Sequence, residues 1–378
     1  MSTLKADTVT AATTNGNLAI SNQGTGGIAI DGMPHKNLII NGDMRIAVRG
    51  TSFAAAANGI FSLDRWENID GGAGVVTITQ DTDTPTVAEA GTDFKFSYKV
   101  DVTTADASLA ATDQYNIHYK IEGFDTAHLG FGAANAATVT LSFWVKSPKT
   151  GAHYVAIMNS ALDRSYPALF TIASADTWEK QEIVIAGDTS GTWIGATNGI
   201  GLRLLFTLAV GTNFDNGTAG AWGAGQNYAA SGVVNCMDDA ANNFYLTGVQ
   251  LEVGAAATDF EHRDYASELA RCQRYYDKVT GNGSDWVVGF VRSTTTGSYI
   301  YQYAVEMRSA PTIAFQSVTD CDVRHAATST VCSGLGASGK TTKHCSIDAT
   351  VGSGLTVGHG SYLRWNDADG YVTFDSEL

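Results

Sequence analysis

The stretch TVTLSFWV, residues 138–145, is a short run of β-branched and aromatic side chains. Such a run favours a buried β-strand. Similar strand-like runs recur along residues 36–262, separated by turns rich in Gly, Asn and Asp, and no useful helical periodicity interrupts them. The runs are 75–79, 138–145, 182–185, 202–208 and 245–253. We therefore predict an all-β fold in which residues 36–262 form one large antiparallel sandwich.

Residues 1–35 contain short β segments with thin apolar faces, punctuated by glycine. The apolar residues are Leu18, Ile20, Ile28 and Ile30. One chain cannot bury enough surface on such segments to offset the entropy lost on ordering them. We interpret residues 1–35 as an N-terminal arm for attachment and oligomerisation, with a floppy terminus as the alternative.

A linker helix is predicted over residues 263–280. Tyr265, Leu269, Cys272 and Tyr276 follow one another at steps of four, three and four, which places them on one helical face. Asp264 is a suitable N-cap, and Gly281 follows the predicted end.

Residues 281–378 return to strand patterns and predict a smaller C-terminal β-sandwich. Alternation is clear over residues 299–307, and long polar loops are expected at 316–350 and 352–361. Shorter strand-like runs lie at 312–315, 362–365 and 371–374.

Composition excludes several classes of protein. The chain has 38 acidic and 23 basic residues, a formal net charge of −15, and 44% hydrophobic residues. The hydrophobic content argues against a disordered tail, and the negative charge argues against nucleic-acid binding. The N-terminus does not resemble a signal peptide, and no apolar run predicts membrane insertion. Five cysteines at low density are expected to be reduced thiols in a protein made in a cytoplasm.

Two motifs resemble a nucleotide-binding loop and a metal site, but we predict that neither binds its ligand. Residues 334–341, GLGASGKT, match a phosphate-binding loop, but the following residues are poor helix formers, so a polar surface loop is expected. Residues 321–345 include three Cys and two His whose spacing fits no compact zinc site. These are Cys321, His325, Cys332, His344 and Cys345. No catalytic signature appears, and we expect no catalytic residues, metal or cofactor.

Candidate ligand-binding residues are exposed aromatic side chains near the loops of the C-terminal region, because sugars stack on such rings. Trp286, Tyr362 and Trp365 are the candidates, with burial in the core as the alternative, above all for Tyr362 and Trp365. The stripe Tyr299, Tyr301 and Tyr303 is expected to face the core or a subunit rather than a sugar.

Several motifs, taken as a set over residues 36–315, resemble a family of tailed-phage fibre proteins, and the first seven residues resemble N-termini of marine phage structural proteins. The matching stretches are 36–46, 49–53, 63–66, 142–146, 175–180, 201–204, 244–254, 258–261, 269–276 and 307–313. The resemblance implies a jelly-roll sandwich like that of carbohydrate-binding modules, usually trimeric and displayed on the virion surface. It implies attachment to other virion proteins through the arm, contact with host-surface glycans, and no transferable site residues.

The function expected from this resemblance is that of a virion fibre protein that binds host glycans and is not an enzyme. A head fibre or decoration protein without receptor duty is the main alternative, and a glycan depolymerase is a further one. Bacterial surfaces are themselves anionic, so binding by an acidic chain needs a divalent cation or a patch locally free of acids.

Overall fold

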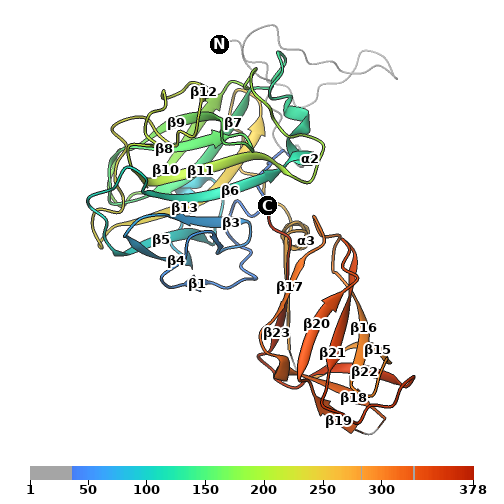
Figure 1. Ribbon diagram of the computed structural model, residues 1–378. Coiled ribbons are helices and arrows are strands. Elements are labelled where there is room, and N and C mark those ends of the chain that lie inside the picture. Colours follow the sequence, from blue (N-terminus) through green and yellow to red (C-terminus); the bar gives the residue numbers. More distant parts are fainter. Residues whose placement is uncertain (1–35, 282, 327) are drawn as a thin grey trace.

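The computed structural model describes residues 36–281, 283–326 and 328–378 (Figure 1). The arm residues Leu18, Ile20, Ile28 and Ile30 lie outside the described residues. In the described part the chain is nearly all β, arranged as two antiparallel sandwiches, which confirms the predicted fold class. None of the helices found in these ranges is long and apolar enough to cross a membrane.

The large sandwich has two antiparallel sheets. The first has the order β1 (Ser52–Phe53), β4 (Val75–Asp81), β5 (Ser97–Thr104), β13 (Asn243–Val253), β7 (Val139–Lys146) and β10 (Glu179–Ile185). The second has the order β12 (Gly223–Ala224), β9 (Arg164–Ile172), β8 (Gly151–Met158), β11 (Ile200–Val210), β6 (Gln114–Glu122), β3 (Trp66–Asp70) and β2 (Ile60–Phe61). All five predicted strand runs of this region overlap these strands almost completely, and only residue 138 falls outside.

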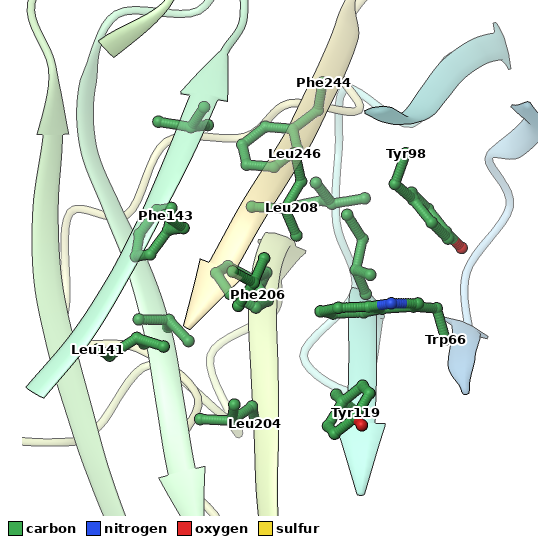
Figure 2. Packing of buried hydrophobic residues seen from close by; sticks show 14 of the residues in the cluster. Trp66, Tyr98, Tyr119, Leu141, Phe143, Leu204, Phe206, Leu208, Phe244 and Leu246 are labelled. Atoms are coloured by element: carbon green, nitrogen blue, oxygen red, sulfur yellow. The ribbon is translucent and has the colours of Figure 1, made fainter. Parts of the chain in front are cut away.

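Aromatic rings from both sheets fill the core of the large sandwich (Figure 2). Trp66 is fully buried, and its ring centroid lies 4.7 Å from that of Tyr119. The rings of Phe143 and Phe206 meet edge to face, with 5.1 Å between their centroids. The Trp66 indole N–H donates to the carbonyl of Asn41 at 3.0 Å, so its polar atom is satisfied inside the core. Burial of these rings is the main stabilising contribution to the sandwich.

The short helices lie in connections. They are α1 (Val87–Ala90), α2 (Gly123–Thr126), the 3₁₀ turns η1 (Ala127–Leu129) and η2 (Val318–Asp320), and α3 (Tyr265–Gln273). Asp264 caps α3 by accepting from the Ser267 N–H at 2.9 Å, as predicted. The helix is shorter than the predicted 263–280, because Tyr276–Thr280 form strand β14, which pairs with β23. Sheet pairing overrides the helical spacing of Tyr276.

The small sandwich begins at β14 and has two sheets. The first has the order β14, β23 (Tyr371–Asp375) and β17 (Thr312–Phe315). The second has the order β19 (Thr328–Val331), β18 (Cys321–His325), β22 (Gly360–Trp365), β15 (Asp285–Val291), β16 (Thr296–Gln302), β21 (His344–Thr350) and β20 (Gly334–Ser338).

Two expectations for this region are wrong. Residues 316–350 are not a long loop, because four strands of the larger sheet lie within them. The alternation of residues 299–307 does not mark one strand, because β16 ends at Gln302 and the chain turns there.

The two sandwiches touch through ionic contacts around α3. Arg274 binds both carboxylate oxygens of Glu122, at 2.7 and 3.0 Å, and the Tyr275 hydroxyl donates to the same carboxylate at 2.7 Å. Arg308 of the small sandwich exchanges hydrogen bonds with Asn198 of the large one, at 2.8 and 3.0 Å. Figure 1 shows the C-terminal end of the chain between the two sandwiches, beside α3.

Candidate functional site

The three predicted stacking residues do not form one site. Trp365 is 2% exposed and lies in the core of the small sandwich, so its candidacy is wrong. Trp286 is half-buried and stacks on Trp365 with 4.8 Å between ring centroids. A register shift between Asp285 and Val287 accompanies this packing. Tyr362 is the member of the trio on the surface, with 38% of its area exposed.

Tyr362 belongs to an apolar patch on the outer face of the seven-stranded sheet of the small sandwich. It pairs with Val288 across one strand boundary and with Arg324 across the other. Val288 is 74% exposed, and Ile300 and Phe290 nearby are also exposed. We call Tyr362, Val288, Phe290, Ile300 and Arg324 the outer patch. Exposed apolar groupings of this kind mark interaction sites.

The charged side chains around the outer patch differ in whether they have polar partners. Arg324 is exposed and makes no ion pair or side-chain hydrogen bond within the described ranges. Of the acids on this face, Asp348 accepts from Arg292, Ser298 and Ser338. Asp322 is buried; its Oδ2 accepts from Ser329 at 3.1 Å, while its Oδ1 has no hydrogen-bond partner among the described residues. The patch thus offers a free cation beside an exposed ring.

The tyrosine stripe faces the core, as expected. Tyr299 is fully buried, and its hydroxyl lies 3.1 Å from that of Ser361. Tyr301 stacks on Phe374 with 4.9 Å between centroids and 6° between planes. Tyr303 is 8% exposed. The stripe therefore contributes packing and offers no sugar platform.

The phosphate-loop motif has no helix after it. Gly334–Ser338 form strand β20, which pairs with the next strand, β21, and the turn between them carries the exposed Lys340. Part of the motif is therefore a strand and not the surface loop that we expected. Without a following helix, no row of helix N-terminal amides faces the turn.

The cysteines of the small sandwich fill its core. Cys321, Cys332 and Cys345 are each at most 2% exposed, and burial raises the pKa of the Cys332 thiol to about 12. His344 is exposed, and its Nδ1 lies 3.3 Å from the Thr341 hydroxyl oxygen. Across the described ranges no three His, Cys, Asp or Glu side chains gather in a way that could hold a metal ion.

A pocket that the sequence analysis missed lies on the outer face of the six-stranded sheet of the large sandwich. It has a volume of about 250 Å³ and is lined by Trp144 and Ser142 of β7. Their neighbours Leu141 and Phe143 point into the core, so strand alternation turns Ser142 and Trp144 outward. We call this cavity the Trp144 pocket. The stretch SFWVK at 142–146 contains Ser142 and Trp144, but the sequence alone marks it only as one of the stretches that carry the family resemblance.

The walls of the Trp144 pocket come from two separate loops. Residues 90–94, at and after the end of α1, form one side, and residues 258–260, which follow β13, form the other. The rings of Phe94 and Phe260 meet edge to face at 5.2 Å. The Thr92 hydroxyl lies 2.6 Å from Nε2 of His262, which joins the two loops a second time.

A bulge in β13 forms part of the pocket. The pairing of β13 with β7 shifts register between Thr247 and Gln250, and Gly248 there has φ +60°. A Cβ at this glycine would lie 2.7 Å from the Phe94 ring and 3.2 Å from Trp144. Glycine is therefore needed both for the backbone conformation and for the close approach of the two rings.

The bulge is held from the opposite side by residues 36–46. Asn37 donates to the carbonyl of Val249 at 3.1 Å and accepts from the N–H of Leu251 at 3.1 Å. The Gly42 carbonyl accepts from the Val249 N–H at 2.9 Å. Two of the stretches that carry the family resemblance, 36–46 and 244–254, thus support each other in the fold.

A second cavity, of about 260 Å³, lies between η1 and the loop before β11. Phe131, Trp193 and Ile194 form its walls, and the fully buried Leu129 and Leu202 lie beneath. The Trp193 indole donates to Ser190 of its own loop at 3.1 Å. The residues that line this cavity include no charged side chain, unlike those of the Trp144 pocket.

No protein-family model and no curated protein matches the chain. Solved structures match over parts of it. The enzymatically active domain of bacteriophage CBA120 tailspike protein 4 aligns over 58% of this chain and 22% of its own, at 14% identity and a TM-score of 0.30. The chain thus spans about a fifth of that tailspike structure.

Carbohydrate-binding modules match a similar share of this chain. A CBM4 structure aligns over 56% of this chain and 97% of its own, at 13% identity and a TM-score of 0.28. The family 11 module of a Clostridium thermocellum cellulosomal cellulase aligns over 56% of this chain and 98% of its own, at 12% identity and a TM-score of 0.27. These scores establish no relationship, so the resemblance to tailed-phage fibre proteins stays an expectation.

Proposed function

We propose that this chain is a fibre protein of a tailed-phage virion that binds host-surface glycans through the outer patch of its small sandwich. The observation that carries the proposal is the pairing of the exposed Tyr362 with the unpaired Arg324 on adjacent strands. A tyrosine ring offers an apolar face to the C–H groups of a sugar, and a guanidinium binds carboxylate or phosphate in bidentate fashion.

Charge supports an anionic glycan as the ligand. The chain carries a formal net charge of −15, so most of its surface repels an anionic polysaccharide. The outer patch differs, because Asp348 is paired with Arg292 while Arg324 makes no ion pair within the described ranges. Contact at this face avoids repulsion that other faces would impose.

The virion assignment is supported by the resemblance of the motifs between residues 36 and 315 to tailed-phage fibre proteins. The proposal includes a homotrimer, attachment to other virion proteins through residues 1–35, and binding without cleavage. Immunogold electron microscopy of intact particles tests the location. Absence of label from the particles would contradict a virion role. Release of reducing ends from a bound polysaccharide would contradict binding without cleavage.

Binding is tested with the full chain on immobilised polysaccharides, using phosphorylated lipopolysaccharide as the anionic probe and dextran as the neutral one. We expect binding to lipopolysaccharide that Tyr362→Ala and Arg324→Ala each weaken. Tyr265→Ala and Lys343→Ala are matched controls, because both side chains are exposed and lie outside the outer patch. Equal loss in the controls, or no binding to lipopolysaccharide, would overturn the proposal.

A further inference from the structure

We propose that the Trp144 pocket is a second binding site, which takes one neutral hexopyranose residue. This site lies on the large sandwich, whereas the outer patch lies on the small one. The inference does not depend on the outer patch, and it is tested by substituting residues of the Trp144 pocket.

The volume of the pocket limits the ligand to one ring. An apolar cavity of about 150 Å³ holds a bare benzene ring. At about 250 Å³ the Trp144 pocket has room for one six-membered ring with its hydroxyl groups, but not for two rings.

The lining of the pocket is divided into an aromatic and a polar part. Trp144, Phe94 and Phe260 supply the aromatic part. Ser142, Lys180 and Asp259 supply hydroxyl, ammonium and carboxylate groups. A pyranose has the matching division, with C–H groups on its faces and hydroxyl groups around its edge.

Ser142 is the observation that points to a ligand. Its side chain lines the pocket, is 4% exposed and makes no hydrogen bond within the part of the chain that the structure describes. Its Oγ is not among the fully buried polar atoms without a partner, so this hydroxyl group is open to the pocket and can bond to a group placed there. A sugar hydroxyl in the pocket would supply the partner.

The charges of the rim favour a neutral ligand. Lys180 lies 2.7 Å from Glu182, so its ammonium group is already balanced. Asp259 is exposed at the opposite loop and would repel an anion. A neutral sugar can donate hydroxyl hydrogens to Asp259 and accept from Lys180.

The pocket is organised before any ligand arrives. Gly248 keeps the floor open, and the Phe94–Phe260 contact and the Thr92–His262 contact hold the loops together. Thr258 is also held, because its hydroxyl donates to Glu252 at 2.8 Å. Rigid walls reduce the entropy lost on binding, which suits a small ligand.

The test is saturation-transfer NMR on the full chain with the methyl α-glycosides of glucose, galactose and mannose. We expect at least one of them to bind, and Trp144→Leu to weaken its binding by about tenfold or more, since stacking and contact area are lost. Trp193→Leu is the matched control, because Trp193 lines the other cavity. The Trp193→Leu variant should bind the glycoside as tightly as the unchanged protein does.

Ser142→Ala keeps the test decisive if Trp144→Leu does not fold, since it removes one oxygen atom and leaves the packing in place. It should weaken binding of the same glycoside while the thermal unfolding curve stays unchanged. The proposal is overturned if none of the three glycosides binds, or if Ser142→Ala and a folded Trp144→Leu bind as the unchanged protein does. Arg324→Ala, which changes the outer patch, should leave binding of the same glycoside unchanged, and this separates the two sites.

Discussion

The guanidinium carbon of Arg65 lies 3.5 Å from the ring centroid of Tyr275, so a charge from the large sandwich is stacked on an aromatic ring beside α3. Arg65 is 1% exposed and also pairs with Glu377, which follows the last strand of the small sandwich. Arg49 repeats the arrangement, 3.5 Å above the Tyr276 ring and 3.2 Å from Glu377. Arg49 also pairs with Asp375 at 3.2 Å, so two arginines and two carboxylates join the sandwiches here.

Glu377→Gln should lower the free energy of unfolding by about 3–5 kcal/mol, because it leaves the Arg65 charge buried without its partner. Urea unfolding followed by tryptophan fluorescence measures the change. Asp93→Asn is the control, because its pair with Lys95 is largely exposed and its loss should cost less than about 1 kcal/mol. A similar small effect for both variants would show that the joint is not held by this pair.

Asp64 should make stability fall as pH rises. Burial raises its pKa from 3.8 to about 6, against the opposing effect of Arg49. The folded state therefore binds this proton more tightly than the unfolded state, and the stabilisation, full below pH 4, is lost as pH rises through 6.

Asp64→Asn should therefore raise the free energy of unfolding at pH 8, by up to about 3 kcal/mol, and flatten its dependence between pH 4 and pH 8. The amide can still accept from the Val48 N–H, as Oδ2 now does at 2.6 Å. Urea unfolding at several pH values measures this. An unchanged pH profile would show that the pKa of Asp64 is not raised in the folded protein.

Lys340→Ala should change neither thermal stability nor ligand binding, because Lys340 lies in an exposed turn with a strand after it. Isothermal titration with ATP and GTP checks the motif directly. Micromolar binding that the substitution abolishes would restore the phosphate-loop interpretation.

The five thiols should not react with a thiol reagent until the chain unfolds. Cys236, Cys272, Cys321, Cys332 and Cys345 are all free and buried. Burial raises the pKa of Cys236 to about 12, so its reactive thiolate form is scarce at neutral pH. Titration with a thiol reagent in the absence and presence of urea counts the thiols that react in the folded and in the unfolded protein. Fast reaction of any thiol in the folded protein would place that residue on the surface.

The sequence by itself determined the main strands of the large sandwich and where α3 begins, because alternation, β-branched residues and an N-cap act over a few neighbouring positions. The runs at 138–145 and 245–253 and the cap at Asp264 are examples. The sequence did not predict the four strands within residues 316–350. The tertiary structure decided which face of each strand is covered. Tyr362 and Trp365 lie in one strand run, yet the opposite sheet covers Trp365 and leaves Tyr362 exposed. Strand period places residues on two faces but does not say which face meets another layer. The Trp144 pocket needed the fold for the same reason, since its walls come from residues 90–94 and 258–260, which are distant in sequence and meet only when β5 and β13 pair.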